Sequence, residues 1–250
     1  MTQFLKGLIC IIFTFAFSKA IAYQAIIFDC DGVLVDTEGL KFTAWKQVLS
    51  KVGINFEESE YIPLVGYSSA YIAQKIQEKK NIEFDQQEVI NEKEIIYHQL
   101  QSRGVPLFED GIDFLKQVIS QKNIYHFKVA IASSASQQEI LENLKQIGVN
   151  ARDFDLIISG HDDLRHIIDS EGVNKPKPYI YQICATLLQV LPQDCLVFED
   201  SNAGVIAATD ANMNVIAVPN RFTQNQDFSQ AIQVTTFKQI NFKTIIQLDA

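Results

Sequence analysis

The sequence predicts an α/β fold: a Rossmann-like, doubly wound parallel sheet into which an all-helical domain is inserted. Short, wholly apolar runs recur along the chain, as in strands that are buried on both faces of a parallel sheet. From residue 109 onward these runs alternate with amphipathic helical segments, whereas residues 39–108 show helical spacing alone. The chain has 250 residues, which is enough for one full core and a smaller inserted domain.

The first expected strand covers residues 25–28 and ends in two carboxylates. In an extended chain Asp29 and Asp31 point the same way and Cys30 points the other way. Two carboxylates this close repel each other unless a cation lies between them or one of them holds a proton. Asp29 could then serve as an ionised nucleophile and Asp31 as a general acid. The alternatives are a solvated loop, or an EF-hand loop, which fits poorly because Gly32 is two positions too early.

Residues 39–108 are expected to form the inserted helical domain. The first helix should end near Gly53, and the last should begin after Asp85. A segment of this length is not an ordinary crossover between two parallel strands. The apolar positions at helical spacing are Leu40, Ala44, Trp45, Val48 and Leu49, then Tyr71, Ile72 and Ile76, then Val89, Ile90, Ile96 and Leu100.

Residues 109–250 alternate between helices and strands and, with residues 23–38, form the expected core domain. Ser136 and Glu139 have the spacing of a helix capping box, and Pro178 suits the first turn of a helix. Open sheets of this kind bind their ligands beyond the carboxyl ends of the strands. The expected strands are 128–132, 156–158, 195–198 and 215–218, and the expected helices are 111–121, 136–148 and a helix from residue 178.

Polar side chains stand at the strand ends where such a sheet binds its ligand. Ser133 and Ser134 follow the second expected strand, and Glu199 and Asp200 follow the fourth. Lys175 precedes the helix that leads to the fourth strand. Phosphoryl transfer needs a nucleophile, a metal ion and hydrogen-bond donors around the phosphoryl oxygens. Carboxylates suit Mg²⁺, hydroxyl groups near a helix N-terminus suit phosphate, and a lysine supplies a point charge.

Each of these residues also has an ordinary structural explanation. The two serines could cap the next helix, and Lys175 could be a surface lysine that competes with Lys177 for the role. Glu199 and Asp200 could be an acidic pair that favours a helix N-terminus. All the residue types that phosphoryl transfer requires occur together and in order. Their joint occurrence favours a site for phosphoryl transfer over the separate structural explanations.

The same segments resemble known motifs. Residues 29–38 read Asp-Cys-Asp-Gly-Val-Leu-Val-Asp-Thr-Glu and resemble the first motif of the haloacid dehalogenase-like superfamily of phosphohydrolases and phosphomutases. Within that superfamily they look like the β-phosphoglucomutase-like subgroup. Residues 131–134, 175–178 and 197–201 resemble the second, third and fourth motifs. In the subgroup, an insert after the first motif is a helical cap that closes over the active site, which implies this role for residues 39–108.

The resemblance also implies a mechanism. Asp29 would attack phosphorus and form an aspartyl-phosphate, while Asp31 would protonate the leaving oxygen and then activate water or an incoming hydroxyl. The expected site comprises Asp29 and Asp31 for catalysis; Ser133, Ser134 and Lys175 for the phosphate; Asp29, Asp31 through its backbone carbonyl, Glu199 and Asp200 for Mg²⁺; and Lys41 and Gly66 for the substrate in the cap.

The sequence departs from the subgroup pattern in two places. The loop at 160–174 is longer than usual, and we interpret its His161 and His166 as loop residues unless they line the cleft. The segment 64–69 around Gly66 lacks the basic residues that sugar-phosphate mutases place there. We therefore expect a magnesium-dependent phosphatase that acts on a small phosphate ester, such as a sugar phosphate. The alternatives are a phosphomutase and a binding module on a former enzyme scaffold.

Charge and cysteine content narrow the possible partners. Thirty acidic against 21 basic residues give a net charge of −9, which argues against nucleic-acid binding. We expect a monomer whose partner is a small phosphorylated metabolite. The cysteines beyond the N-terminal segment are odd in number, which does not suit a disulfide framework. We expect free, buried thiols at Cys30, Cys184 and Cys195, although Cys184 and Cys195 could pair.

Residues 1–22 have the pattern of a signal peptide. Lys6 precedes an apolar stretch at 8–17, and the small residues Ala20 and Ala22 mark a cleavage site. We therefore predict an exported protein, periplasmic or secreted, that starts at or near Tyr23 and has no stable membrane insertion. The alternative is an uncleaved membrane anchor.

N-terminal sequencing of native protein should give Tyr23 or a close neighbour; an intact Met1 would contradict the prediction.

Overall fold

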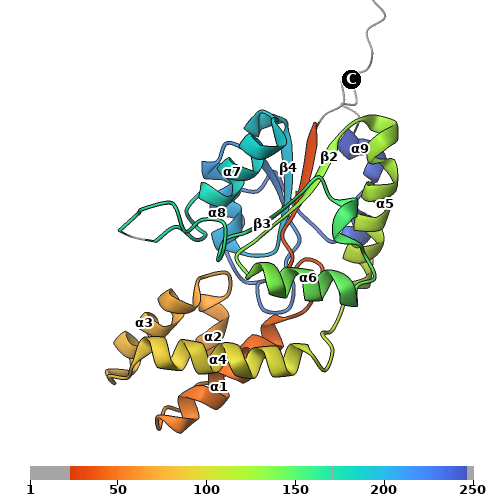
Figure 1. The fold of residues 1–250 in the computed structure, drawn as a ribbon. Coiled ribbons are helices and arrows are strands. Elements are labelled where there is room, and N and C mark those ends of the chain that lie inside the picture. The colour runs from red at the N-terminus through yellow and green to blue at the C-terminus, as the bar shows by residue number, and fades with distance from the viewer. Residues whose placement is uncertain (1–22, 171, 247–250) are drawn as a thin grey trace, which may run out of the picture.

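The computed structural model describes residues 23–170 and 172–246, so the expected signal segment lies outside it. The described residues form one six-stranded sheet in the order β3-β2-β1-β4-β5-β6, and all its strands are parallel (Figure 1). The expected α/β fold is confirmed, and the short edge strand β6 is an addition. The strands are β1 (Ala25–Phe28), β2 (Lys128–Ser133), β3 (Leu156–Ser159), β4 (Cys195–Glu199), β5 (Asn214–Ala217) and β6 (Gln233–Val234).

The register of the three central strands brings the polar strand ends together. Phe28, the last residue of β1, is paired with Ile131 of β2 and Phe198 of β4. The backbone N–H of Asp29 then donates to the carbonyl of Phe198 at 3.0 Å. Asp29, Ser133 and Glu199 consequently lie at one edge of the sheet, the edge where parallel sheets bind ligands.

Helices cover both faces of the sheet, and the side chains of each strand alternate between them. Ile26 and Phe28 pack with α5, α6 and α9, while Ile27 packs on the opposite face with α7 and α8 (Figure 1). Burial on both faces explains why the strands read as continuous apolar runs. The helices are α5 (Glu109–Tyr125), α6 (Gln137–Gln146), α7 (Tyr179–Leu188), α8 (Asn202–Asp210) and α9 (Phe242–Ile246).

A helical segment, which we call the cap, is inserted between β1 and α5 and packs around its own apolar centre. Trp45, Leu49 and Tyr61 are buried in this centre, and Phe222 of the core inserts into it. The division into domains at residues 39 and 108 remains an interpretation of the sequence. The cap helices are α1 (Glu38–Lys51), α2 (Glu58–Tyr61), α3 (Ser69–Lys80) and α4 (Gln86–Gln101).

The inward face of α4 differs from the expected apolar face. Its buried residues recur at intervals of four positions and are Val89, Lys93, Tyr97 and Gln101. Ile96 is only partly buried. Polar residues belong on this face because α4 borders a cavity as well as α1, and because Gln101 contacts Asn143 of the core.

Two other sequence predictions, for a helix cap and for the cysteines, are confirmed. Ser136 and Glu139 form the expected capping box of α6. Cys30, Cys184 and Cys195 are free and buried. Within the described parts of the chain, no helix is both long and apolar enough to cross a bilayer.

The aromatic cluster beneath the sheet gives a direct test of the packing. Phe114 of α5 is 4 % exposed and contacts the rings of Phe28 and Phe198, whereas Ile124 of the same helix is 63 % exposed. We predict that Phe114→Ala lowers the free energy of unfolding by about 3–5 kcal/mol because it leaves a cavity. Ile124→Ala should change it by less than about 0.5 kcal/mol. Equal effects in denaturant titrations would contradict the assigned packing.

Candidate active site

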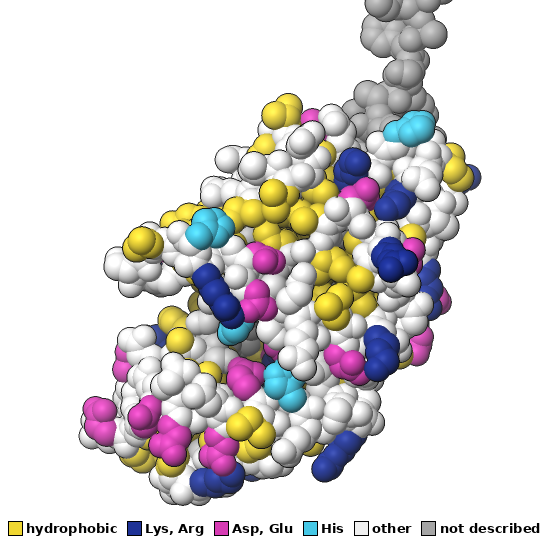
Figure 2. Space-filling model, viewed as in Figure 1, with side chains coloured by type: hydrophobic (Ala, Val, Ile, Leu, Met, Phe, Trp, Pro, Cys, Tyr) yellow, Lys and Arg dark blue, Asp and Glu magenta, His cyan; other side chains and the backbone are white. Residues whose placement is uncertain are grey.

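A cavity of about 530 Å³ lies between the cap and the strand ends. Figure 2 shows the surface hollowed between the core and the cap. The cavity is lined by residues from both parts, and every site residue expected from the sequence is among them. These residues are Asp29, Asp31, Lys41, Gly66, Ser133, Ser134, Lys175, Glu199 and Asp200.

Lys175 is the buried cation at the floor of this cavity. Its Nζ donates to Asp29 Oδ1 at 2.7 Å, to Glu199 Oε1 at 2.5 Å and to the carbonyl of Ala132 at 3.2 Å. Burial alone would lower the pKa of Lys175, but the carboxylates of Asp29 and Glu199 outweigh it and raise the pKa above its ordinary value. Lys175 is therefore charged. Lys177, the competing candidate, pairs with Asp169 at 3.6 Å instead.

Asp29 is almost completely buried, and its charge is only partly compensated. Burial raises the pKa of Asp29 to about 7, Lys175 opposes this rise, and the nearby carboxylates of Glu199 and Asp31 add to it. A second cation beside Lys175 would favour the ionised form of Asp29.

Asp200 is closely packed at the end of β4. Its Oδ2 accepts a hydrogen bond from Asn220 Nδ2 at 2.7 Å. Gly32 packs against it with a φ of +85°, and a Cβ there would lie 2.3 Å from Asp200 Oδ2. A residue with a side chain would displace Asp200, so the glycine of the first motif is required both by its conformation and by this contact.

Glu199 has fewer free oxygen lone pairs for a cation than Asp200 has. Its Oε1 accepts from Lys175 and from the hydroxyl of Tyr181 at 2.6 Å, and its Oε2 accepts from the backbone N–H of Asp200 and the hydroxyl of Ser201. These bonds hold Glu199 firmly and use most of its lone pairs. Asp200 consequently offers more open oxygen lone pairs to a cation than Glu199 does.

The acidic residues fit a divalent cation. Ligand oxygens of Asp29, Glu199 and Asp200 all lie within 4.8 Å of one another. Three carboxylates against the single ammonium of Lys175 leave two excess negative charges, which one Mg²⁺ would balance. Burial, followed by the neighbouring carboxylates, raises the pKa of Asp200 well above its ordinary value.

Asp31 lies beside this acidic cluster but faces different partners. Its Oδ1 accepts from the hydroxyl of Thr37 at 2.7 Å and from Asn143 Nδ2 at 3.4 Å. Its Oδ2 lies 3.4 Å from both Lys41 Nζ and the hydroxyl of Ser133. The expected contribution of its backbone carbonyl to a metal site stays a prediction.

The two serines after β2 line the cavity. The hydroxyl of Ser133 accepts from the backbone N–H of Ala135 at 3.1 Å and points toward Asp31, while Ser136 caps α6. Serine hydroxyl groups therefore line the cavity near the start of a helix, where an anion is favoured. Phosphate binding by Ser133 and Ser134 stays a prediction.

The two expected cap contacts have clear structural partners. Lys41 pairs with Glu38 at 3.0 Å as well as with Asp31. A Cβ on Gly66 would lie 2.7 Å from the hydroxyl of Ser201, and the φ of Gly66 is +95°. Gly66 thus allows the cap to approach the core closely.

Sequence reasoning missed the contribution of α4 to the cavity. Lys93, Glu94 and His98 line it, and Lys93 Nζ is paired with Glu94 at 3.0 Å. Lys93 also lies over the rings of Trp45 and Tyr97. The sequence signal for this face is the recurrence of large polar residues every four positions along α4.

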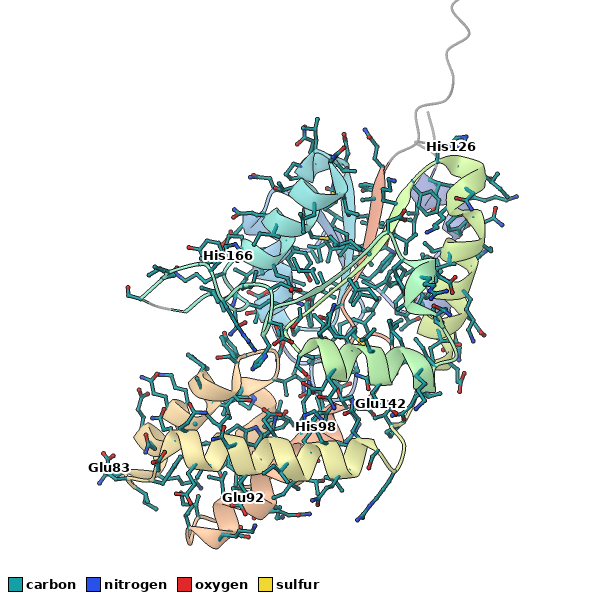
Figure 3. All side chains as sticks on the ribbon, in the orientation of Figure 1. Glu83, Glu92, His98, His126, Glu142 and His166 are labelled. Atoms are coloured by element: carbon teal, nitrogen blue, oxygen red, sulfur yellow. The ribbon has the colours of Figure 1, made fainter. Side chains whose placement is uncertain are left out.

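The histidines occupy different places. His98 lies on the α4 surface that faces α6, while His126 is at the far end of the core and His166 is on the long loop after β3 (Figure 3). His161 lines the cavity, whereas His166 does not line it and is exposed. The long loop therefore contributes His161 to the cleft.

Comparisons with known proteins agree with this geometry. A sequence model described as haloacid dehalogenase-like hydrolase matches residues 26–218. A phosphorylated carbohydrates phosphatase from Thermotoga maritima is 31% identical over 197 residues, which are 77% of this chain and 83% of that protein. A β-phosphoglucomutase from Bacillus subtilis is 30% identical over 203 residues, which are 78% of this chain and 83% of that protein. The crystal structure of a β-phosphoglucomutase from Clostridium difficile superimposes with a TM-score of 0.70 at 26% identity, covering 89% of this chain and 95% of that one.

The two lysines of the loop before α7 give a matched test. We predict that Lys175→Gln lowers phosphoryl-transfer activity at least about 100-fold, because a charge beside the reacting group is lost. It should also destabilise the protein by about 3–5 kcal/mol, because Asp29 and Glu199 lose their buried partner. Lys177→Gln should cost less than about 1 kcal/mol and leave activity nearly unchanged. Steady-state kinetics and denaturant titration check both variants, and the reverse order of effects would contradict the assignment.

Proposed function

The chain belongs to the haloacid dehalogenase-like hydrolase family, with relatives in its β-phosphoglucomutase-like group, and we propose that it is a magnesium-dependent phosphatase of sugar phosphates or similar small esters. The observation that carries the proposal is the buried contact of Lys175 with Asp29 and Glu199, next to Asp200. This group supplies a nucleophile, a fixed positive charge and cation ligands at the floor of one cavity.

The residues divide the reaction between two carboxyl groups. Asp29 attacks phosphorus and becomes an aspartyl-phosphate, while Lys175 orients it and balances charge on the phosphoryl oxygens. Asp31 gives a proton to the leaving oxygen and then takes one from the attacking water. Mg²⁺ would be held by Asp29, Asp200 and Glu199, and it would supply charge that favours ionised Asp29 and stabilises the phosphoryl oxygens.

The charges in the cap favour hydrolysis over isomerisation. A mutase must hold a bisphosphate and exclude water, which calls for free cationic groups, typically an arginine fork, at the far end of the site. Among the described residues that line the cavity there is no arginine. The lysines that the cap contributes, Lys41 and Lys93, are both paired with carboxylates of the protein.

The wall away from Asp29 suits the rest of a sugar-like substrate. Ser69 and Asn91 contribute polar groups, and Tyr67 contributes a ring. The similarity to a phosphorylated carbohydrates phosphatase from Thermotoga maritima supports the same substrate class. A phosphomutase remains the second candidate, because β-phosphoglucomutases are relatives of comparable identity.

One assay separates the two candidates. With Mg²⁺ and a sugar bisphosphate activator present, we predict that the protein releases phosphate from β-glucose 1-phosphate faster than it forms glucose 6-phosphate. Asp29→Asn should lower phosphate release at least about 1,000-fold, because an amide cannot act as the nucleophile. Faster isomer formation would establish the mutase instead. Near-normal phosphate release by Asp29→Asn would show that the nucleophile is assigned wrongly.

A further inference from the structure

A chain of buried side-chain hydrogen bonds connects the cap to Asp31. Asn143 of α6 is fully buried, and its Nδ2 donates to Asp31 Oδ1 at 3.4 Å. Gln101, the last residue of α4, is 3 % exposed, and its Nε2 donates to Asn143 Oδ1 at 2.9 Å. His98 Nδ1 lies 3.2 Å from Gln101 Oε1.

The chemical groups determine which partner donates and which accepts in each hydrogen bond between His98 and Asp31. The carboxylate of Asp31 can only accept, so the amide nitrogen of Asn143 must face it and the amide oxygen must face Gln101. The Nε2 of Gln101 also faces the backbone carbonyl of Glu139 at 3.4 Å, which is a second acceptor. The amide oxygen of Gln101 therefore faces His98, whose Nδ1 must act as the donor.

The two oxygens of Asp31 consequently have different surroundings. Oδ1 is bound by two neutral donors, Thr37 and Asn143, and points into the protein. Oδ2 faces Ser133 and Lys41, which both line the cavity. The two groups that bind Oδ1 do not line the cavity, whereas the two beside Oδ2 do, so Oδ2 is the oxygen that a substrate in the cavity can reach.

We propose that Asn143 and Gln101 are positioning residues for Asp31, which hold Oδ1 inward so that Oδ2 faces the leaving oxygen of the substrate. The proposal rests on the function of Asp31 as the acid and base of the phosphatase reaction. Neither amide would touch the substrate: Asn143 acts through Asp31, and Gln101 acts through Asn143. Because Gln101 belongs to the cap and Asn143 to the core, the orientation of Asp31 depends on the position of the cap.

Gln146 offers a matched control on the same helix. It lies one turn beyond Asn143 and also binds the cap: its Nε2 donates to the carbonyl of Gln101 at 3.2 Å, and its Oε1 accepts from the N–H of Val105 at 2.9 Å. Both bonds end at backbone atoms of Gln101 and Val105, and neither includes the side chains that link Gln101 through Asn143 to Asp31. Gln146→Leu therefore removes an anchor of the cap and leaves those side-chain hydrogen bonds in place.

The test compares leaving groups that differ in their need for an acid. When the P–O bond of glucose 6-phosphate breaks, glucose departs as an alkoxide unless its oxygen is protonated, whereas p-nitrophenyl phosphate releases p-nitrophenolate, a good leaving group. Single-turnover rates of the first step should fall about tenfold or more for glucose 6-phosphate in Asn143→Leu, since general acid catalysis contributes about 100-fold or more. The rate with p-nitrophenyl phosphate should change less than about threefold by the same reasoning. Gln101→Leu should shift the ratio of the two rates in the same direction, and Gln146→Leu should leave it unchanged.

Two controls separate the possible failures. Asp31→Asn must itself change the ratio; if it does not, the role of Asp31 in the proposed function is wrong, and the positioning role falls with it. If Asp31→Asn changes the ratio but Asn143→Leu and Gln101→Leu slow both substrates equally, or have no effect, the positioning proposal is overturned alone. Thermal unfolding checks each variant, and Gln101→Leu decides the matter if Asn143→Leu does not fold.

Discussion

The site depends on one buried interaction, the contact of the Lys175 ammonium with Asp29 and Glu199. Three carboxylates meet where β1 and β4 end, and burial of so much like charge would be strongly unfavourable without a partner. Lys175 neutralises part of this charge. It donates its third hydrogen bond to the backbone carbonyl of Ala132 in β2. The remaining excess of negative charge suits a divalent cation, so the same interaction that permits the fold also prepares the chemistry.

The surrounding structure serves to place these groups and to separate their roles. The register of β1 with β2 and β4 brings Asp29 beside Ser133 and Glu199, although they are far apart in the chain. The backbone turn at Gly32 lets Asp200 approach closely. Asp29 faces a lysine and acidic neighbours, whereas Asp31 faces hydroxyl and amide donors and Lys41. Their different surroundings thus suit the two carboxyl groups of one motif to the different functions that we propose for them.

Sequence patterns predicted the core of the fold and the positions of the residues at the strand ends. Those residues follow apolar runs directly, so a local signal identifies Asp29, Ser133 and Glu199 and their common edge. Asn143, Gln101 and Lys93 could not be found in this way. They lie within helices, and their significance comes from partners in distant segments, which neither periodicity nor spacing reveals. The edge strand β6 was also missed, because its two residues are exposed and have no apolar pattern.

The most direct test of the central claim is to locate the covalent phosphate. Protein that is quenched in acid during turnover of a sugar phosphate with Mg²⁺ can be digested, and its phosphorylated peptide can be mapped by mass spectrometry. The arrangement around Lys175 predicts phosphate on Asp29, and its absence in Asp29→Asn. Phosphate on Asp31 or Ser133, or active turnover without any phosphorylated peptide, would contradict it.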